Sequence, residues 1–175
     1  MDLESLFAQL QSTQSAASAV RLSDRNVIEL VNKLKQLGIL GDDLLHTISG
    51  KEYITTARLK QDINTALAQA GGRLSLVELP ALLGVDLVHC EAQAAALVAE
   101  ARQAHVLQGG GQASLVQAQG ELMTSQYFDA VAAEINDLLQ ETGQLSLADL
   151  AMQYSLTSEL LMSVVTARME SVIQV

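Results

Sequence analysis

The chain has 175 residues, of which 49% are hydrophobic and only 3% aromatic, and its formal net charge is −10. This length fits one domain or a few very small ones with an aliphatic core. The excess of acidic residues argues against direct nucleic-acid binding, which needs a basic face that releases counterions from phosphates. The single cysteine, Cys90, excludes a disulfide framework or a multi-cysteine metal site within one chain.

Residues 1–20 predict a marginal amphipathic helix, because its apolar side chains share one face: Leu3, Leu6, Phe7 and Leu10. Two interpretations are open, a frayed terminal helix packed on its own chain or a docking helix that inserts into a groove on a partner. The acidic start argues against a signal peptide. No stretch approaches about 18 unbroken apolar residues, so we expect any membrane association to come through a partner.

Residues 21–38 predict a helix with clear start and stop signals. Ser23 or Asp24 can accept hydrogen bonds from the first free N–H groups, and Gly38 can end the helix in the left-handed conformation. The apolar residues recur at helical spacing and form one stripe: Val27, Leu30, Val31, Leu34 and Leu37.

Two short runs follow at residues 44–48 and 51–55, and Ser49-Gly50 between them predicts a two-residue hairpin turn. A helix followed by a β-hairpin is the second half of a winged helix, but only one weak helix precedes residue 21. The half unit at 21–55 therefore leaves a helix stripe and a sheet edge uncovered. We expect a second polypeptide to cover them.

Residues 56–120 predict a complete winged helix. Its expected elements are a helix at 56–70, a short strand at 73–74, a helix capped by Ser75 and Glu78 that contains Pro80 and ends at Gly84, a long helix at 85–102, a strand at 105–107, a wing tip at Gly109-Gly110-Gly111 and a returning strand at 114–117.

The pattern then repeats. The run GRLSLVEL at 72–79 is echoed by GQLSLADL at 143–150, and EYIT at 52–55 by ELMT at 121–124, so the offsets are 71 and 69 residues. We expect the intervening helix to absorb the difference. The third unit, 121–175, then has helices at 125–142, 146–154 and 157–168 and a strand at 172–175, and it lacks its last strand. The predicted fold class is mainly α with short β-hairpins, arranged as tandem winged-helix repeats.

The residues predict no catalytic group, metal site or cofactor. His46, His89 and His105 are scattered over different elements and lack metal-pair spacing. Cys90 is interpreted as a small core residue, with a thioester-forming nucleophile as the alternative. The glycines at 109–111 lack the Lys-Ser/Thr ending of a phosphate loop. An acidic helix face is interpreted as a solvated surface or, second, as the site of a basic partner: Glu134, Asp137 and Glu141.

Several runs carry a resemblance to a known family: RLSDRNVIELVNKL at 21–34, HTISGKEYIT at 46–55, GGRLSLVEL at 71–79, VDLVH at 85–89 and EINDLLQETGQLSLADL at 134–150. They are similar to the N-terminal region of the ubiquitin-fold modifier ligases, the third-step enzymes of ufmylation. The sequence departs from this family in a longer, more polar run after residue 108 and in Cys90, and family members continue through further domains.

The resemblance implies a scaffold-type ligase without a catalytic cysteine, which binds the modifier-charged conjugating enzyme and promotes transfer to target lysines, including lysines of a ribosomal protein. It implies that the leader helix binds the conjugating enzyme through Leu3, Leu6, Phe7 and Leu10. It also implies that a DDRGK-domain adaptor, anchored in the endoplasmic reticulum membrane, completes the half winged helix. The residues expected at the adaptor are Val27, Leu30, Val31, Leu34, Ile48, Tyr53 and Ile54.

The implied location is the cytosolic face of the endoplasmic reticulum membrane, with the cytosol or nucleus as further sites. Two other functions stay open on the residues alone. One is a winged-helix interaction adaptor that binds partners without changing a transfer rate. The other is a nucleic-acid regulator, against which the charge of −10 argues.

Overall fold

The computed structural model describes residues 23–41, 43–107, 114–169 and 172–173. The chain divides into two compact units, Met1–Asp42 and Asp43–Val175, and each is treated separately below. The division falls inside the predicted half winged helix at 21–55. Both the predicted leader helix at 1–20 and the glycines at 109–111 lie outside the described residues.

The described part of the first unit is helix α2 (Asp24–Gln36), which begins and ends where the sequence predicts. The Ser23 side chain accepts a hydrogen bond from the Asn26 N–H. At the other end Gly38 has φ +68°, and its N–H donates to the Lys35 carbonyl at 2.9 Å. This left-handed stop satisfies the last helix carbonyls.

The second unit opens with a hairpin of β1 (Leu44–His46) and β2 (Tyr53–Thr55). The predicted two-residue turn at Ser49-Gly50 is wrong, because the loop spans residues 48–51. The Thr47 N–H donates to the Glu52 carbonyl and closes this longer loop, and the Thr47 hydroxyl lies 3.0 Å from the Ser49 hydroxyl.

The next elements are α3 (Thr56–Gln69), β3 (Arg73–Ser75), the 3₁₀ turn η1 (Leu76–Glu78), α4 (Leu79–Leu83), α5 (Leu87–Leu107), β4 (Leu115–Ala118) and β5 (Glu121–Thr124). The last two strands and β3 form an antiparallel sheet in the order β3-β5-β4. Helices and sheet enclose a core that includes Leu59 and Ile63, both 0% exposed.

Two predictions for this region are wrong. Residues 105–107 are the end of α5 and not a strand, and the strand that pairs with β5 beside it is β4, farther along the chain. Ser75 makes no capping bond, because it is the last residue of β3 and the following turn is 3₁₀. The hairpin of β4 and β5 turns at Gln119-Gly120, whose φ angles of +54° and +77° suit a tight turn between twisted strands.

Three helices follow, α6 (Ser125–Thr142), α7 (Leu147–Gln153) and α8 (Ser158–Arg168), close to their predicted positions. They enclose a second core around Phe128 and Leu161. The predicted strand at 172–175 appears, among its described residues, only as a single bridge between Met169 and Ile173. The structure is thus mainly helical with small antiparallel sheets.

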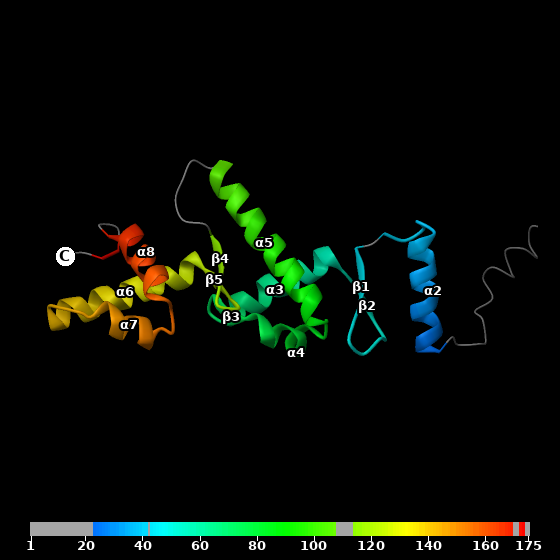
Figure 1. Cartoon of the computed structure of the whole chain (residues 1–175), viewed down its shortest axis with the longest axis horizontal. Helices are drawn as coiled ribbons and strands as arrows, with labels where there is room; N and C mark the ends of the chain where they lie inside the picture. Colours follow the sequence, from blue (N-terminus) through cyan, green and yellow to red (C-terminus); the bar gives the residue numbers. More distant parts are fainter. Residues whose placement is uncertain (1–22, 42, 108–113, 170–171, 174–175) are drawn as a thin grey trace, which may run out of the picture. The chain divides into compact units, whose positions relative to one another are not determined.

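The sheet β3-β5-β4 lies between the two groups of helices, as Figure 1 shows. Adjacent residues of β5 point to opposite faces, so Leu122 joins the core of α3–α5 while Met123 joins the core of α6–α8. The domain boundary predicted after residue 120 falls between the two strands of this hairpin. β5 therefore completes one set of helices and leads directly into the next.

Candidate protein-interaction surface

The hairpin β1–β2 and helix α3 repeat the hairpin β4–β5 and helix α6 in detail. Thr55 caps α3 by accepting from the Arg58 N–H, and Thr124 caps α6 by accepting from the Tyr127 N–H. Each hairpin is also hydrogen-bonded to the first residue of the helix that follows it. The Thr56 N–H donates to the Asp43 carbonyl, and the Ser125 N–H donates to the Ser114 carbonyl. These matches put Leu44, Leu45, Tyr53 and Ile54 in register with Leu115, Val116, Leu122 and Met123.

One face of the first hairpin packs on the helices that follow it. Leu45 is 9% exposed, and the partly buried Ile54 packs with it against the core of α3–α5. Their counterparts, Val116 and Met123, pack in the same sense on the core of α6–α8. Ile54 is therefore in part a core residue of its own unit.

The opposite face of the hairpin carries Leu44 and Tyr53, which are partly buried. Their counterparts are Leu115, 7% exposed, and Leu122, 0% exposed, and both are sealed by the three helices that precede their hairpin. The unit Asp43–Val175 begins with the first hairpin and so contains no preceding helices of its own. Within this unit, the outer face of the first hairpin lacks the three preceding helices that cover its repeat.

The outer edge of β2 has no paired strand among the described residues. In the second sheet, β5 pairs through Glu121, Leu122 and Met123 with strand β3. At the matching positions of β2, Glu52–Ile54, the described part of the chain offers no second strand. Residues 52, 54 and 56 bond or pair toward β1, and the alternation of an antiparallel ladder therefore directs the N–H and C=O of Tyr53 and Thr55 outward. Such an edge is a template for another strand.

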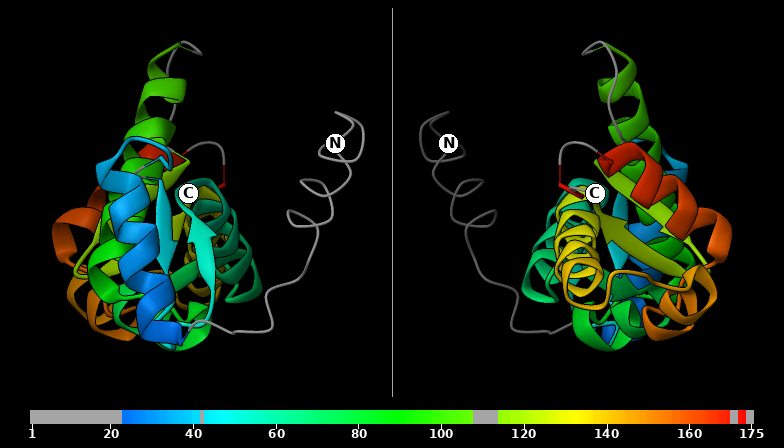
Figure 2. Two further views of the ribbon diagram at one scale, coloured as in Figure 1. Left: turned by 90° about the vertical axis from the view of Figure 1, so that its right-hand side faces the viewer. Right: turned by 90° about the vertical axis from the view of Figure 1, so that its left-hand side faces the viewer.

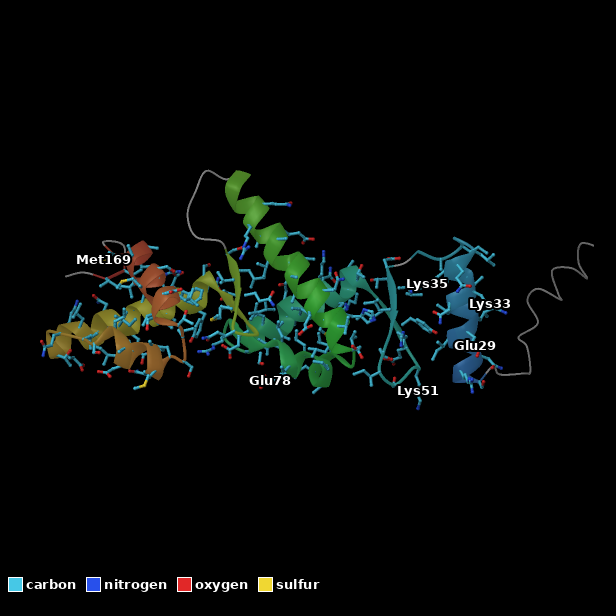
Figure 3. All side chains as sticks on the ribbon, in the orientation of Figure 1. Glu29, Lys33, Lys35, Lys51, Glu78 and Met169 are labelled. Atoms are coloured by element: carbon cyan, nitrogen blue, oxygen red, sulfur yellow. The ribbon has the colours of Figure 1, made fainter. Side chains whose placement is uncertain are left out.

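The loop of this hairpin is apolar at its tip and held in place. The Ile48 N–H donates to the Gly84 carbonyl at 2.8 Å, which ties the loop to the end of α4. The Ile48 side chain remains 64% exposed. Lys51 projects from the same loop (Figure 3).

The predicted adaptor residues fall into two groups. Val27, Leu30, Val31 and Leu34 lie on α2 in the first unit, where Leu30 is 47% exposed and the other three are partly buried. Ile48, Tyr53 and Ile54 lie on the hairpin of the second unit. The predicted conjugating-enzyme residues, Leu3, Leu6, Phe7 and Leu10, lie outside the described residues. None of these predicted roles is tested by the structure.

Sequence reasoning missed Leu44. Its signal was present, because Leu44 precedes Leu115 by 71 residues, the offset that relates the two later motifs. Alternation in the strand then places it on the face of Tyr53. The Tyr53 Oη atom is itself buried and without a hydrogen-bond partner among the described residues.

Cys90 does not have the surroundings of a nucleophile. Its side chain is 0% exposed in the core of α3–α5, and Sγ lies 3.6 Å from the Val85 carbonyl, to which the thiol donates. Burial, followed by the charges of Asp86 and Glu91, raises the pKa of the thiol. Since the thiolate is the reactive form, Cys90 is held inert.

The remaining chemistry is sparse. Across the part of the chain that the structure describes, there is no group of three or more His, Cys, Asp or Glu side chains that could hold a metal ion. No single helix in that part is long and apolar enough to cross a membrane, although residues 76–83 and 87–104 reach that length and composition as a pair bent by 116°.

The described residues thus define a mainly helical protein with small antiparallel sheets, in which β2 has an unpaired edge and the one cysteine is buried. The E3 UFM1-protein ligase 1 family matches residues 2–175, and the chain belongs to this family.

Relatives in this family are found in plants and animals. The chain is 43% identical over 173 residues to the E3 UFM1-protein ligase 1 homolog of Oryza sativa subsp. indica, which covers 99% of this chain and 20% of the relative. It is 36% identical over 173 residues to the E3 UFM1-protein ligase 1 of Danio rerio, with the same coverage. The chain therefore spans about a fifth of the length of the curated relatives it matches.

Among solved structures, the mRNA-binding domain of elongation factor SelB from E. coli in complex with SECIS RNA aligns with 63% of this chain and 84% of its own. The sequence identity is 18% and the TM-score is 0.36, a value too low to assign a fold.

Proposed function

We propose that the chain is a component of a scaffold-type ligase in ufmylation, which binds the modifier-charged conjugating enzyme and promotes transfer to target lysines. Membership of the ligase family supports this role, and the buried Cys90 argues against a thioester on this chain. A scaffold raises the rate by positioning the charged enzyme and the acceptor, without a nucleophile of its own.

We propose that each repeat is a winged helix. The order α3, β3, α4, α5, β4 and β5, with the sheet order β3-β5-β4, supports this for the middle unit. The matched joints at Thr55 and Thr124 support a tandem arrangement in which each hairpin leads into the first helix of the next unit.

The half winged helix at 21–55 is proposed to be completed by the DDRGK-domain adaptor of the endoplasmic reticulum membrane. The observation that carries this proposal is the open edge of β2, at the positions where β5 pairs with β3. A partner that supplies a strand there, and helices over Leu44 and Tyr53, would bury these two side chains as their counterparts Leu115 and Leu122 are buried in the second hairpin. The proposed site would be at the cytosolic face of that membrane, with ribosomal protein among the targets.

The leader residues Leu3, Leu6, Phe7 and Leu10 are proposed to bind the conjugating enzyme. The support is their shared face in the sequence pattern and the family's use of scaffolding. A chain with separate sites for adaptor and conjugating enzyme would hold the two on one scaffold.

The test is a single-turnover discharge of charged conjugating enzyme to free lysine, with the chain alone, the adaptor alone and both together. We expect discharge to rise only when both are present. Binding without any stimulation would leave a non-catalytic interaction adaptor and contradict the ligase role.

The adaptor surface is tested separately by binding. Leu44→Asp is expected to weaken adaptor binding at least about tenfold, because a charge would be buried in the completed unit. Val88→Asp, at a valine that is 68% exposed outside the hairpin, is the matched control and should bind normally. Equal binding of the adaptor by both variants, with unchanged melting temperatures for the free chains, would show that the adaptor does not bind at the first hairpin.

A further inference from the structure

A shallow apolar groove lies on the third set of helices, away from the first hairpin. It has a volume of about 730 Å³ and lies between the start of α7 and the outer face of α8. Its apolar lining comes from Leu147, Met162 and Ala167, and its polar lining residues are Ser158, Glu159, Ser163 and Thr166. The right-hand view of Figure 2 looks onto these helices.

The fold does not require an apolar residue at the centre of the groove, because the equivalent position of the middle unit is charged. At the offset of 71 residues, Met162 of α8 corresponds to Glu91 of α5, which is exposed. The middle unit therefore carries a carboxylate at the position where α8 has an apolar side chain. Met162 is 50% exposed, so α8 has an apolar side chain on a solvent-facing surface.

Methionine is concentrated here. Among the described residues, all exposed methionines lie at α7 and α8: Met152, Met162 and Met169. Figure 3 shows Met169 at the end of α8. Unbranched, polarizable methionine side chains are common on surfaces that bind helices, because they adapt to the partner's shape.

The charge around the groove has one sign. Residues 121–169 hold seven acidic residues and one basic residue, Arg168. Arg168 is only 6% exposed, and its Nε donates to the Asp129 carboxylate at 2.7 Å, so it offers no charge to a ligand. Glu159 lines the groove, and the exposed Asp149 is two residues from Leu147.

We propose that this groove binds an amphipathic helix with basic flanks from a protein partner. The groove follows α8 from Ser158 to Ala167, which at the helical rise is about 14 Å and matches two to three turns of a partner helix. The partner's apolar stripe would contact Met162 and Leu147, and its Lys or Arg residues would face Glu159 and Asp149. This site is independent of the adaptor and conjugating-enzyme surfaces proposed above.

The test uses a fluorescein-labelled synthetic helix with leucines at i, i+3, i+4 and i+7 and lysines on both flanks, titrated with the 175-residue chain. A peptide with the same leucines and glutamates on the flanks is the charge control. We expect the lysine peptide to bind at least about tenfold more tightly than the glutamate peptide, with a gap that narrows as salt is raised.

Two pairs of variants locate the site. Met162→Gln should weaken binding at least about fivefold, whereas Met152→Gln, at a methionine that does not line the groove, should change it less than about twofold. Glu159→Lys should weaken binding, whereas Glu91→Lys on α5 should not. All four positions are exposed, so folding should be retained. Equal effects within either pair, or equal binding of the two peptides, would overturn the proposal.

Discussion

Gly84 and Ser155 occupy equivalent points of the repeat, 71 residues apart, and both have a left-handed backbone, with φ +64° and +50°. Each follows a short helix that packs against the next one. At the second site the Ser155 N–H donates to the Met152 carbonyl, and the Leu156 N–H to the Ala151 carbonyl. At both points the chain leaves a short helix through a left-handed residue, once with glycine, which suits that conformation, and once with a side chain that is strained there.

Ser155→Gly is therefore expected to stabilise the protein by about 0.5–1 kcal/mol. A side chain in the left-handed region costs about 1–2 kcal/mol, and the greater freedom of glycine in the unfolded chain offsets part of this gain. Urea unfolding measures the difference. Gly84→Ser is the reciprocal control and should lower the free energy of unfolding; a less stable Ser155→Gly protein would contradict the strain argument.

Gly72→Ala should be more damaging than Gly143→Ala, although the two glycines are equivalent in the repeat. A Cβ at Gly72 would lie 2.4 Å from Thr124 Oγ1 and 3.2 Å from Tyr127 Cβ, whereas a Cβ at Gly143 meets no atom within 4 Å. We expect a loss of about 1 kcal/mol at Gly143 from backbone strain alone. At Gly72 the loss should be about 2–4 kcal/mol, because overpacking adds to the strain. Similar losses of stability at both sites, measured by thermal unfolding, would show that Gly72 is not packed tightly against Thr124 and Tyr127.

Arg73→Met should loosen the link between the sheet and the end of α7. The guanidinium donates to the Glu121 carboxylate at 2.9 Å, to Tyr127 Oη at 3.0 Å and to the Tyr154 carbonyl at 2.6 Å. We expect a loss of about 1–3 kcal/mol, because these partly buried acceptors would be left unpaired. Arg58→Met, which removes an exposed pair with Asp62, is the control and should cost less than about 0.5 kcal/mol.

Tyr154→Phe should change how stability depends on alkaline pH. Burial, then the nearby Glu134 carboxylate, raises the pKa of Tyr154 from its ordinary value of 10.0 to about 12. The folded state therefore keeps a proton that the unfolded chain releases, so stability from this group is complete below about pH 10 and is lost as pH rises toward about 12.

The measurement is the free energy of unfolding from about pH 8 to about pH 11 for both proteins. The phenylalanine variant should lose less stability over this range than the wild type. Parallel pH profiles would show that Tyr154 does not titrate differently on folding.

Cys90 should react slowly with a thiol reagent in the native protein and rapidly in urea, because its side chain is 0% exposed and its thiol pKa is raised. Cys90→Ala should leave lysine discharge by the chain and its adaptor unchanged. Loss of discharge in a Cys90→Ala protein that remains folded would revive the nucleophile interpretation.

Local signals predicted most helix positions. Ser23 and Gly38 bound α2 as predicted, because a cap depends only on residues within a turn or two of it. The caps of α3 and α6, Thr55 and Thr124, follow the same rule but were not predicted. The repeat offset was also readable, and it contained the signal for Leu44 that the site prediction missed. The end of α5 was predicted wrongly because a run as short as residues 105–107 is compatible with either a strand or the last turn of a helix.

The order of amino acids alone gave the 71-residue offset between the two later motifs and the start and stop signals of α2. The burial of Cys90, which separates its two interpretations, came from the tertiary structure. The tertiary structure alone decided which strand is central, which face of each hairpin is sealed and which edge stays open. The physical reason is that a strand's pairing and burial depend on residues distant in the chain. Leu122 is fully buried and its counterpart Tyr53 is not, because three helices precede one hairpin in its own unit and none precedes the other.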